Sequence, residues 1–184
     1  MIDRRRWLTG AVAGIATAGG IAAAWWHARA NSATAAGPAA NPGANDLAEM
    51  WAMHFDRPEG GELDMAKLRG KPLLINFWAT WCAPCVRELP AFDRFHREHK
   101  AKGWQVLGLA VDGPTPVREF LTRVKIGFPI GLAGLDGTDL IAKLGNLQGG
   151  LPFTVIIDSQ GHLVQHRMGE TSLGDLTAWA ATVR

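Results

Sequence analysis

Residues 81–86 of this 184-residue chain read Trp81-Cys82-Ala83-Pro84-Cys85-Val86 and contain both of its cysteines. The apolar run Leu73-Leu74-Ile75-Asn76-Phe77-Trp78 precedes them and is typical of a buried strand, and a helical pattern follows Cys85. A thiol at the start of a helix lies beside unpaired N–H groups and the positive end of the helix dipole, which stabilise a thiolate. The second thiol is close enough in sequence to close a small ring, as dithiol–disulfide exchange requires.

Two other interpretations of the cysteine pair have weaker support. A purely structural disulfide would close so short a loop that it would remove little entropy from the unfolded chain. Tetrahedral zinc needs about four ligands, usually from two such pairs. The chain has one pair, and the histidines nearest in sequence, His96 and His99, lie further along the expected helix. The pattern therefore favours redox exchange, with no metal and no cofactor.

Three segments resemble the thioredoxin superfamily, and more narrowly its membrane-anchored, extracytoplasmic TlpA/ResA-like thiol-disulfide oxidoreductases. They are Asn76-Phe77-Trp78-Ala79-Thr80-Trp81-Cys82-Ala83-Pro84-Cys85, then Glu88-Leu89-Pro90, then Gly150-Leu151-Pro152-Phe153-Thr154. The resemblance covers about residues 47–184. It implies a protein-disulfide reductase that uses the Cys-Ala-Pro-Cys dithiol.

The position of each cysteine suggests its role in the exchange. Cys82 lies at the helix start, so we expect it to be the more exposed thiol and the nucleophile. Cys85 lies inside the first turn and is expected to resolve the mixed disulfide. Pro84 occupies a position where helical N–H groups are unpaired anyway, so it stiffens the ring at little cost. Ala83 and Pro84 add no charge that would stabilise a thiolate further, which favours a reductant over a strong oxidant.

Three other side chains are expected to support the dithiol. Trp81 is predicted to be an apolar contact surface beside it, whereas Trp78 is predicted to lie in the core. Glu88 lies one helical turn past Cys85 and either influences its proton transfers or is a solvated helix residue. Asn76 occupies the position where ordinary thioredoxins carry a buried aspartate. Proton transfer to Cys85 must then use Glu88, water or another group.

The loop before Phe153 is assigned by resemblance alone. In the family this loop faces the dithiol, so Pro152 is expected to be cis, and the backbone at Leu151 is expected to pair with an extended substrate strand. The residues themselves are equally compatible with an ordinary trans proline that opens the strand.

The pattern from residue 47 onward predicts an α/β order. The turn-rich break at 58–61 predicts an N-terminal β-hairpin between the segments 50–55 and about 63. The later elements are expected at 73–78 (strand), 83–101 (helix, bent at Pro90), 105–111 (strand), a helix capped by Thr115, 139–144 (short helix), 153–157 and 163–168 (hairpin), and a last helix after the capping box Ser172–Asp175. Such an order predicts a thioredoxin-like fold, with a mixed central sheet and helices on both faces.

The first 30 residues are typical of an export segment. Residues 7–26 carry no charge, and as a helix they would span about 30 Å, the thickness of a bilayer core. The arginines before them favour insertion with the C-terminal side outside. A removed signal peptide, cleaved near Ala28-Arg29-Ala30, and a twin-arginine export signal stay open. We therefore expect three regions, namely a signal-anchor or signal peptide (1–30), a flexible linker (31–46) and a periplasmic, extracytoplasmic thioredoxin-like domain (47–184).

The resemblance also implies partners. Its targets would be disulfide-containing proteins, such as apocytochromes c in cytochrome c biogenesis or copper-delivery proteins, and a membrane thiol transporter would supply electrons. The formal net charge is only +2 and its excess lies in the leader, so no nucleic-acid partner is expected. Two other functions stay open: a copper- or zinc-handling module that uses Cys82 and Cys85, and a peroxide-reducing enzyme of the peroxiredoxin type.

Overall fold

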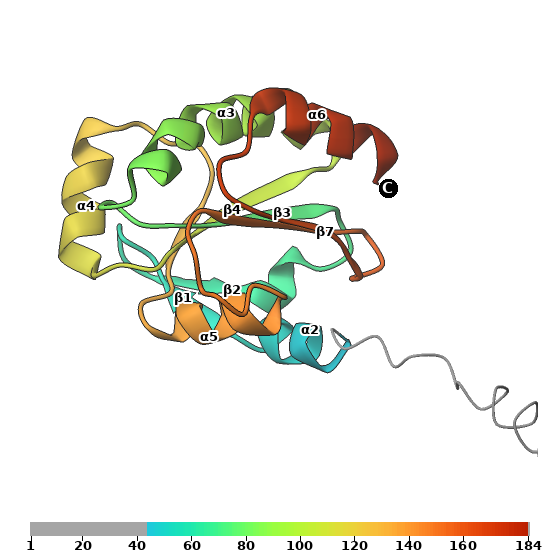
Figure 1. Ribbon diagram of the computed structural model, residues 1–184, viewed down its shortest axis with the longest axis horizontal. Coiled ribbons are helices and arrows are strands. Elements are labelled where there is room, and N and C mark those ends of the chain that lie inside the picture. The colour runs from blue at the N-terminus through green and yellow to red at the C-terminus, as the bar shows by residue number, and fades with distance from the viewer. Residues whose placement is uncertain (1–43, 184) are drawn as a thin grey trace, which may run out of the picture. The chain divides into compact units, whose positions relative to one another are not determined.

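A mixed sheet forms the centre of residues 44–183, the part of the chain that the computed structural model describes (Figure 1). Its strands are β1 (His54–Asp56), β2 (Glu62–Asp64), β3 (Leu73–Trp78), β4 (Gln105–Ala110), β5 (Ile130–Leu132), β6 (Phe153–Ile157) and β7 (Leu163–Met168). Their order across the sheet is β2-β1-β5-β4-β3-β6-β7. The neighbours β5, β4 and β3 are parallel, and the other pairs are antiparallel. The predicted thioredoxin-like arrangement is confirmed.

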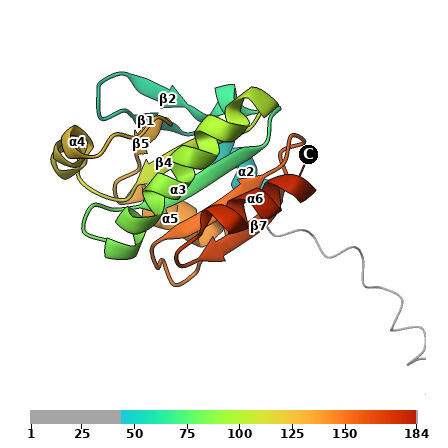
Figure 2. The same ribbon diagram turned by 90° about the horizontal axis from the view of Figure 1, so that it is seen from above.

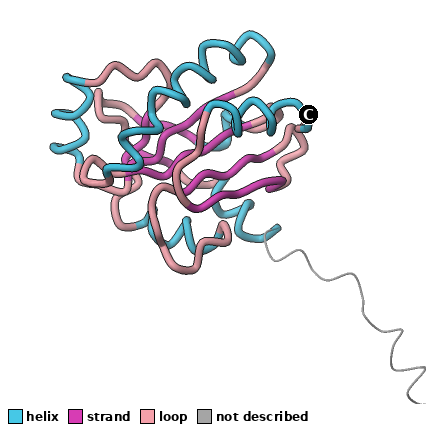
Figure 3. The backbone as a smooth tube through the Cα atoms, turned by 45° about the horizontal axis from the view of Figure 1, so that its top comes forward, coloured by secondary structure: helices cyan, strands magenta, loops and turns pink. Residues whose placement is uncertain are grey.

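Helices cover both faces of this sheet. They are α2 (Ala44–Trp51), α3 (Ala83–His99), α4 (Pro114–Arg123), α5 (Asp136–Lys143) and α6 (Leu173–Thr182), with short 3-10 turns at Met65–Leu68 and Lys100–Lys102. On one face α3 and α6 lie side by side, and α4 contributes to the same apolar cluster (Figure 2). On the other face lie α2 and α5. Figure 3 shows the strands as one layer between the helices.

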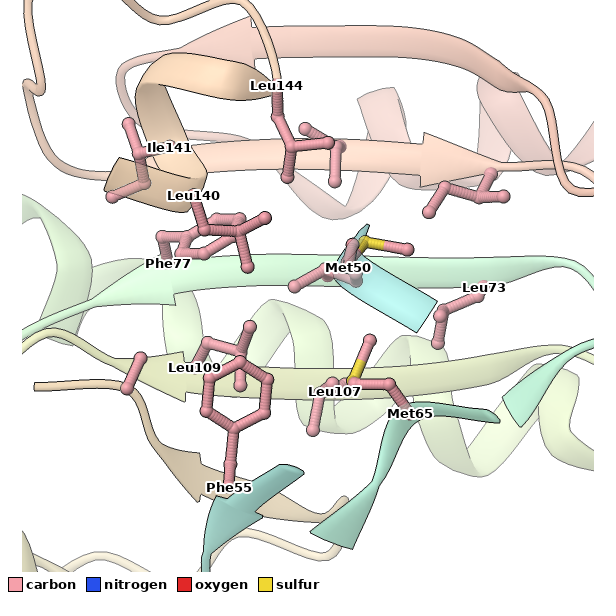
Figure 4. Packing of buried hydrophobic residues seen from close by; sticks show 14 of the residues in the cluster. Met50, Phe55, Met65, Leu73, Phe77, Leu107, Leu109, Leu140, Ile141 and Leu144 are labelled. Atoms are coloured by element: carbon pink, nitrogen blue, oxygen red, sulfur yellow. The ribbon is translucent and has the colours of Figure 1, made fainter. Parts of the chain in front are cut away.

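The central strand β3 is buried on both faces. Because side chains alternate along a strand, Leu74 and Trp78 pack toward α3, whereas Ile75 and Phe77 pack toward α2 and α5. Figure 4 shows the apolar cluster between the sheet and helices α2 and α5, in which Met50 of α2 and Leu140 of α5 lie over the sheet. Each fully buried side chain of this size contributes about 1.5–3 kcal/mol. The end of β3, where the loop to Cys82 begins, is therefore held from both sides.

The N-terminal hairpin is confirmed, but the element before it differs from the prediction. Strands β1 and β2 pair around the turn-rich break, with Phe55 opposite Leu63. Met50 and Trp51 belong to helix α2 rather than to a strand. With Leu47 they form an apolar face at positions i, i+3 and i+4, which packs on the sheet. The helix begins at Ala44, so the expected domain boundary at 47 falls inside it.

Three other predicted boundaries can be compared with the structure. The capping box that starts α6 is confirmed, since Ser172 Oγ accepts a hydrogen bond from Asp175 N at 3.2 Å. The predicted N-cap at Thr115 is wrong: the N-cap is Gly113, two residues earlier, and α4 begins at Pro114. Proline is favoured in a helix's first turn because its fixed φ is already helical and its missing N–H would be unpaired. Helix α5 begins earlier than residue 139, at Asp136.

The expected export segment (residues 1–30) and most of the expected linker lie outside the described residues. Within residues 44–183, no helix is both long and apolar enough to cross a membrane.

Candidate active site

The two cysteines lie where β3 ends and α3 begins. Cys82 is the N-cap residue of α3, and its Sγ accepts a hydrogen bond from Cys85 N at 3.3 Å. Pro84 lies in the first turn. Cys82 and Cys85 form a disulfide with their Cα atoms 5.3 Å apart, so the structure represents the oxidised state. The arrangement places Cys82 Sγ among the unpaired N–H groups of the helix start, which would stabilise a thiolate after reduction.

Solvent access differs between the residues around the disulfide. The exposed fraction is 6% for Cys82 and 0% for Cys85, which agrees in order with the expected nucleophile and resolving thiol. Trp81 is 69% exposed beside them, while Trp78 is fully buried and so lies in the core, as predicted. Ala83 is exposed as well. The solvent-exposed surface beside the disulfide is therefore formed by Trp81 and Ala83.

The loop that carries Pro152 lies beside the dithiol. The Leu151–Pro152 peptide bond is cis, as the resemblance implied. Phe153, the first residue of β6, pairs with Phe77 near the C-terminal end of β3. The residues just before Phe153 therefore lie at the same end of the strands as the dithiol. Asn146 is buried, and its Nδ2 donates to Gly150 O at 2.8 Å, which closes the loop before the proline.

Glu88 is buried rather than solvated, so the interpretation as a surface helix residue is wrong. Only 2% of it is exposed. Its Oε1 accepts from Asn76 Nδ2 and its Oε2 accepts from Thr171 N, each at 2.7 Å. Burial raises the pKa of this carboxyl to about 7, although the hydrogen bonds from Thr171 and Asn76 act in the opposite direction. At neutral pH it can therefore accept or release a proton.

Asn76 connects this carboxyl to the sheet. Its Nδ2 also donates to Thr154 Oγ1 of β6 at 3.2 Å, and both residues are fully buried. Because Glu88 follows Cys85 by three positions in α3, the two side chains share one face of the helix. Asn76 cannot serve as an acid or base, so the titratable group in this buried cluster is Glu88.

Two functional candidates, Thr80 and Asp112, were not found by sequence reasoning. Asp112 follows β4, and its Oδ2 accepts from both Thr80 N (2.9 Å) and Thr80 Oγ1 (2.6 Å). Thr80 is two residues before Cys82. The signal in the sequence was an acidic residue directly after a strand expected to be parallel to β3.

The histidines form no metal site in the described part of the chain. No group of three or more histidine, cysteine or acidic side chains there could hold a metal ion. His162 lies in the turn before β7, with Nδ1 3.3 Å from Asp158 Oδ2. His99 is stacked on Phe95 within α3.

Large exposed apolar side chains lie at the end of the strands where the dithiol is located. Trp81 follows β3, Leu135 follows β5, Leu147 precedes β6, and Met168 ends β7. The strand directions place these four positions at the edge where the dithiol lies. Val164, exposed near the start of β7, lies toward the other edge.

Comparisons with known proteins agree with this geometry. The AhpC/TSA family model matches residues 47–166. Thiol-disulfide oxidoreductase ResA of Bacillus thuringiensis (strain Al Hakam) is 30% identical over 122 residues, which is 66% of this chain and 68% of that protein. The ResA of Geobacillus kaustophilus (strain HTA426) is 34% identical over 119 residues, 64% of this chain and 66% of that protein.

A solved structure shows the same fold. The thioredoxin-related protein from Neisseria meningitidis serogroup B superposes with a TM-score of 0.63 at 26% identity, over 71% of this chain and 97% of that one. With the disulfide at the start of α3 and the matched family model, these likenesses show that the chain belongs to the AhpC/TSA family of thioredoxin-like proteins and is a relative of its ResA thiol-disulfide oxidoreductases.

Proposed function

We propose that this protein is an extracytoplasmic thiol-disulfide oxidoreductase that reduces disulfides in target proteins. The observation that carries the proposal is the Cys82–Cys85 disulfide at the N-terminus of α3, beside the loop that ends in Pro152. A helix start stabilises the thiolate that attacks, and the adjacent thiol resolves the product.

The reaction passes two electrons from the reduced domain to the target. The Cys82 thiolate attacks one sulfur of the target disulfide, which forms a Cys82–target disulfide and releases the other target sulfur as a thiolate. Cys85 then loses its proton and attacks Cys82 Sγ. The second target thiolate leaves, and the Cys82–Cys85 disulfide of the structure remains.

Glu88 is proposed as the group that accepts the proton of Cys85. It lies on the same face of α3, is buried with that thiol, and has a pKa raised to about 7. A base whose pKa is near the working pH combines availability with driving force for proton transfer.

The proposed direction is reduction of the target. Ala83 and Pro84 bring no charge or side-chain donor to Cys82, so thiolate stabilisation comes mainly from the helix start. A strong oxidant has a much more stabilised reduced form, with a potential of about −120 mV, against about −270 mV for thioredoxin. The reduction potential can be measured by equilibrating the protein with glutathione and detecting its free thiols by alkylation. We expect a potential nearer to that of thioredoxin than to that of a strong oxidant. A potential at or above about −150 mV would instead identify an oxidase.

Nucleophile and targets are tested together by trapping. In a Cys85→Ala variant the mixed disulfide at Cys82 cannot be resolved, so target proteins should accumulate on it and be released by dithiothreitol. Apocytochromes c or copper-delivery proteins are the proposed targets, and a membrane thiol transporter is the proposed electron donor. Trapping on Cys82→Ser at the level of the Cys85→Ala variant would show that the nucleophile is assigned wrongly.

Two further assays address the alternatives. A reduced domain that bound copper or zinc tightly but left insulin disulfides intact would be a metal-handling module. Rapid turnover of peroxide would identify a peroxide-reducing enzyme.

The proposed chain organisation is a signal-anchor or signal peptide (1–30), a linker (31–46) and the thioredoxin-like domain (47–184), with α2 reaching back to Ala44. The uncharged span at 7–26 supports export and anchoring in the cytoplasmic membrane. The mature protein should fractionate with membranes and retain its N-terminus. A soluble periplasmic form beginning at Asn31 would instead establish a cleaved signal.

A further inference from the structure

The carboxylate of Asp112 joins the loop after β4 to the loop that carries the dithiol. Its Oδ2 accepts two hydrogen bonds from Thr80, from the backbone N at 2.9 Å and from Oγ1 at 2.6 Å. Its Oδ1 accepts from Gly113 N at 2.7 Å. Both side chains are partly buried. One carboxylate thus fixes the backbone and the side chain of Thr80 at the same time.

The position of Thr80 transmits this restraint to the nucleophile. The backbone hydrogen bonds that join β3 to β4 end with Val111 N donating to Trp78 O at 2.8 Å. Beyond it the chain turns, with Cys82 N donating to Ala79 O at 3.2 Å, and Thr80 lies inside that turn. The orientation of Thr80 therefore sets the direction in which the chain enters Cys82.

We propose that Asp112 is a positioning residue for Cys82, acting through Thr80; the inference rests on the proposed disulfide-exchange function. The carboxylate holds the turn so that Cys82 Sγ stays over the first N–H groups of α3, where it accepts from Cys85 N. A nucleophile that leaves this position loses both its stabilised thiolate and its line of attack. Misplacement on the order of 1 Å can cost up to about a hundredfold in rate.

A matched control is available at the end of the strands opposite to the dithiol. Asp158 also follows a strand, β6, and its Oδ1 accepts from Gln160 N (2.9 Å) and His162 N (2.8 Å). Ile157 pairs with Leu73 at the start of β3, so this turn lies away from the dithiol. Loss of either carboxylate removes hydrogen bonds to a turn, but only Asp112 is connected to Cys82.

The experiment measures the reactivity of Cys82 alone. In the full-length Cys85→Ala chain Cys82 is the single thiol, and its rate of reaction with 5,5′-dithiobis(2-nitrobenzoate) is followed by stopped flow, with thermal unfolding recorded in parallel. We expect Asp112→Ala to lower the rate by about tenfold and Thr80→Val by about threefold. Thr80→Ser keeps the hydroxyl and should stay within about twofold of the parent. Asp158→Ala should lose stability while its rate also stays within about twofold.

The outcomes separate this role from a merely structural one. A rate for Asp158→Ala that falls as far as that of Asp112→Ala would show that reactivity follows stability, and would overturn the proposal. Equal rates for Thr80→Ser and Thr80→Val would also overturn the proposal. If Asp112→Ala does not fold, the comparison of these two variants tests the proposal on its own. If the parent chain reacts normally but insulin is not reduced by the wild-type protein, the proposed function fails while the positioning role stands.

Discussion

Asn76 Nδ2 lies 2.7 Å from Glu88 Oε1, so a buried amide of β3 donates to a buried carboxyl one helical turn beyond Cys85. With the bond from Thr171 N, this gives the carboxylate two hydrogen-bond donors. These bonds lower the pKa of Glu88, but burial has the larger effect and raises it to about 7. The arrangement therefore lets the Glu88 carboxyl gain or lose a proton near neutral pH, as a proton acceptor for a thiol must.

The raised pKa of Glu88 predicts a pH dependence of stability. The folded protein holds this proton up to about pH 7, whereas the unfolded chain loses it near 4.5. The free energy of unfolding should therefore fall as pH rises through this window, by on the order of 3 kcal/mol in total. Glu88→Gln should lack this component. Urea unfolding of the oxidised protein and the variant at pH 5 and pH 8 measures it.

Other groups that titrate between pH 5 and pH 8 are present in both the wild type and Glu88→Gln. The contribution of Glu88 is therefore the difference between the pH dependence of stability of the wild type and that of the variant. Equal losses of stability from pH 5 to pH 8 in wild type and Glu88→Gln would show that Glu88 has an ordinary pKa.

A second prediction concerns the amide partner. Asn76→Asp would place another carboxyl within hydrogen-bond distance of Glu88, and two such groups cannot both ionise without a large cost. The pKa of Glu88 should rise further, and the variant should be destabilised at pH 8 by about 3–5 kcal/mol, the usual cost of an uncompensated buried charge. At pH 5 a shared proton should make the loss much smaller. Urea unfolding at both values provides the measurement.

Asn76→Ala is the control for this effect. It removes the donor to Glu88 and Thr154 but introduces no charge, so its loss of stability should depend on pH much less than that of Asn76→Asp. A loss for Asn76→Asp that is the same at pH 5 and pH 8 would contradict the interpretation by charge.

Local patterns were sufficient for most of the fold and for the dithiol. Strand β3 was predicted because a continuous apolar run marks a strand buried on both faces. The hairpin β6–β7 was predicted because the turn residues Asp158–Gly161 separate the apolar run of β6 from a second strand-like segment. Helix α2 was missed, since eight residues have little helical stability of their own and packing on the sheet decides their conformation.

The parts of the site that could not be predicted depend on distant contacts. The burial of Glu88 depends on Thr171, 83 residues later in the chain, so its position in α3 left a solvated role open. Asp112 meets Thr80 only because β3 and β4 are parallel neighbours, with Trp78 opposite Ala110. Neither contact produces a pattern in the local sequence.

The last prediction concerns recognition of target proteins and compares two apolar side chains of β7. Met168 is 53% exposed, pairs with Phe153 directly after Pro152, and lies against Gly150, where an added Cβ would be 3.2 Å from its Sδ. Val164 is 43% exposed on the same strand, toward the edge away from the dithiol. A protein that docks on the dithiol can bury Met168 but not Val164.

Met168→Ser should therefore lower kcat/KM for insulin reduction by about three- to tenfold, through the lost burial of an apolar side chain. Val164→Ser should leave it within about twofold. The rate with 5,5′-dithiobis(2-nitrobenzoate) should change little in either variant, because a small disulfide does not cover Met168. Insulin reduction and the small-disulfide reaction, measured on both variants at equal folded concentration, separate docking from chemistry. A parallel fall of both rates in Met168→Ser would mean that the substitution disturbs the Pro152 loop itself, and equal insulin rates in the two variants would mean that targets dock elsewhere.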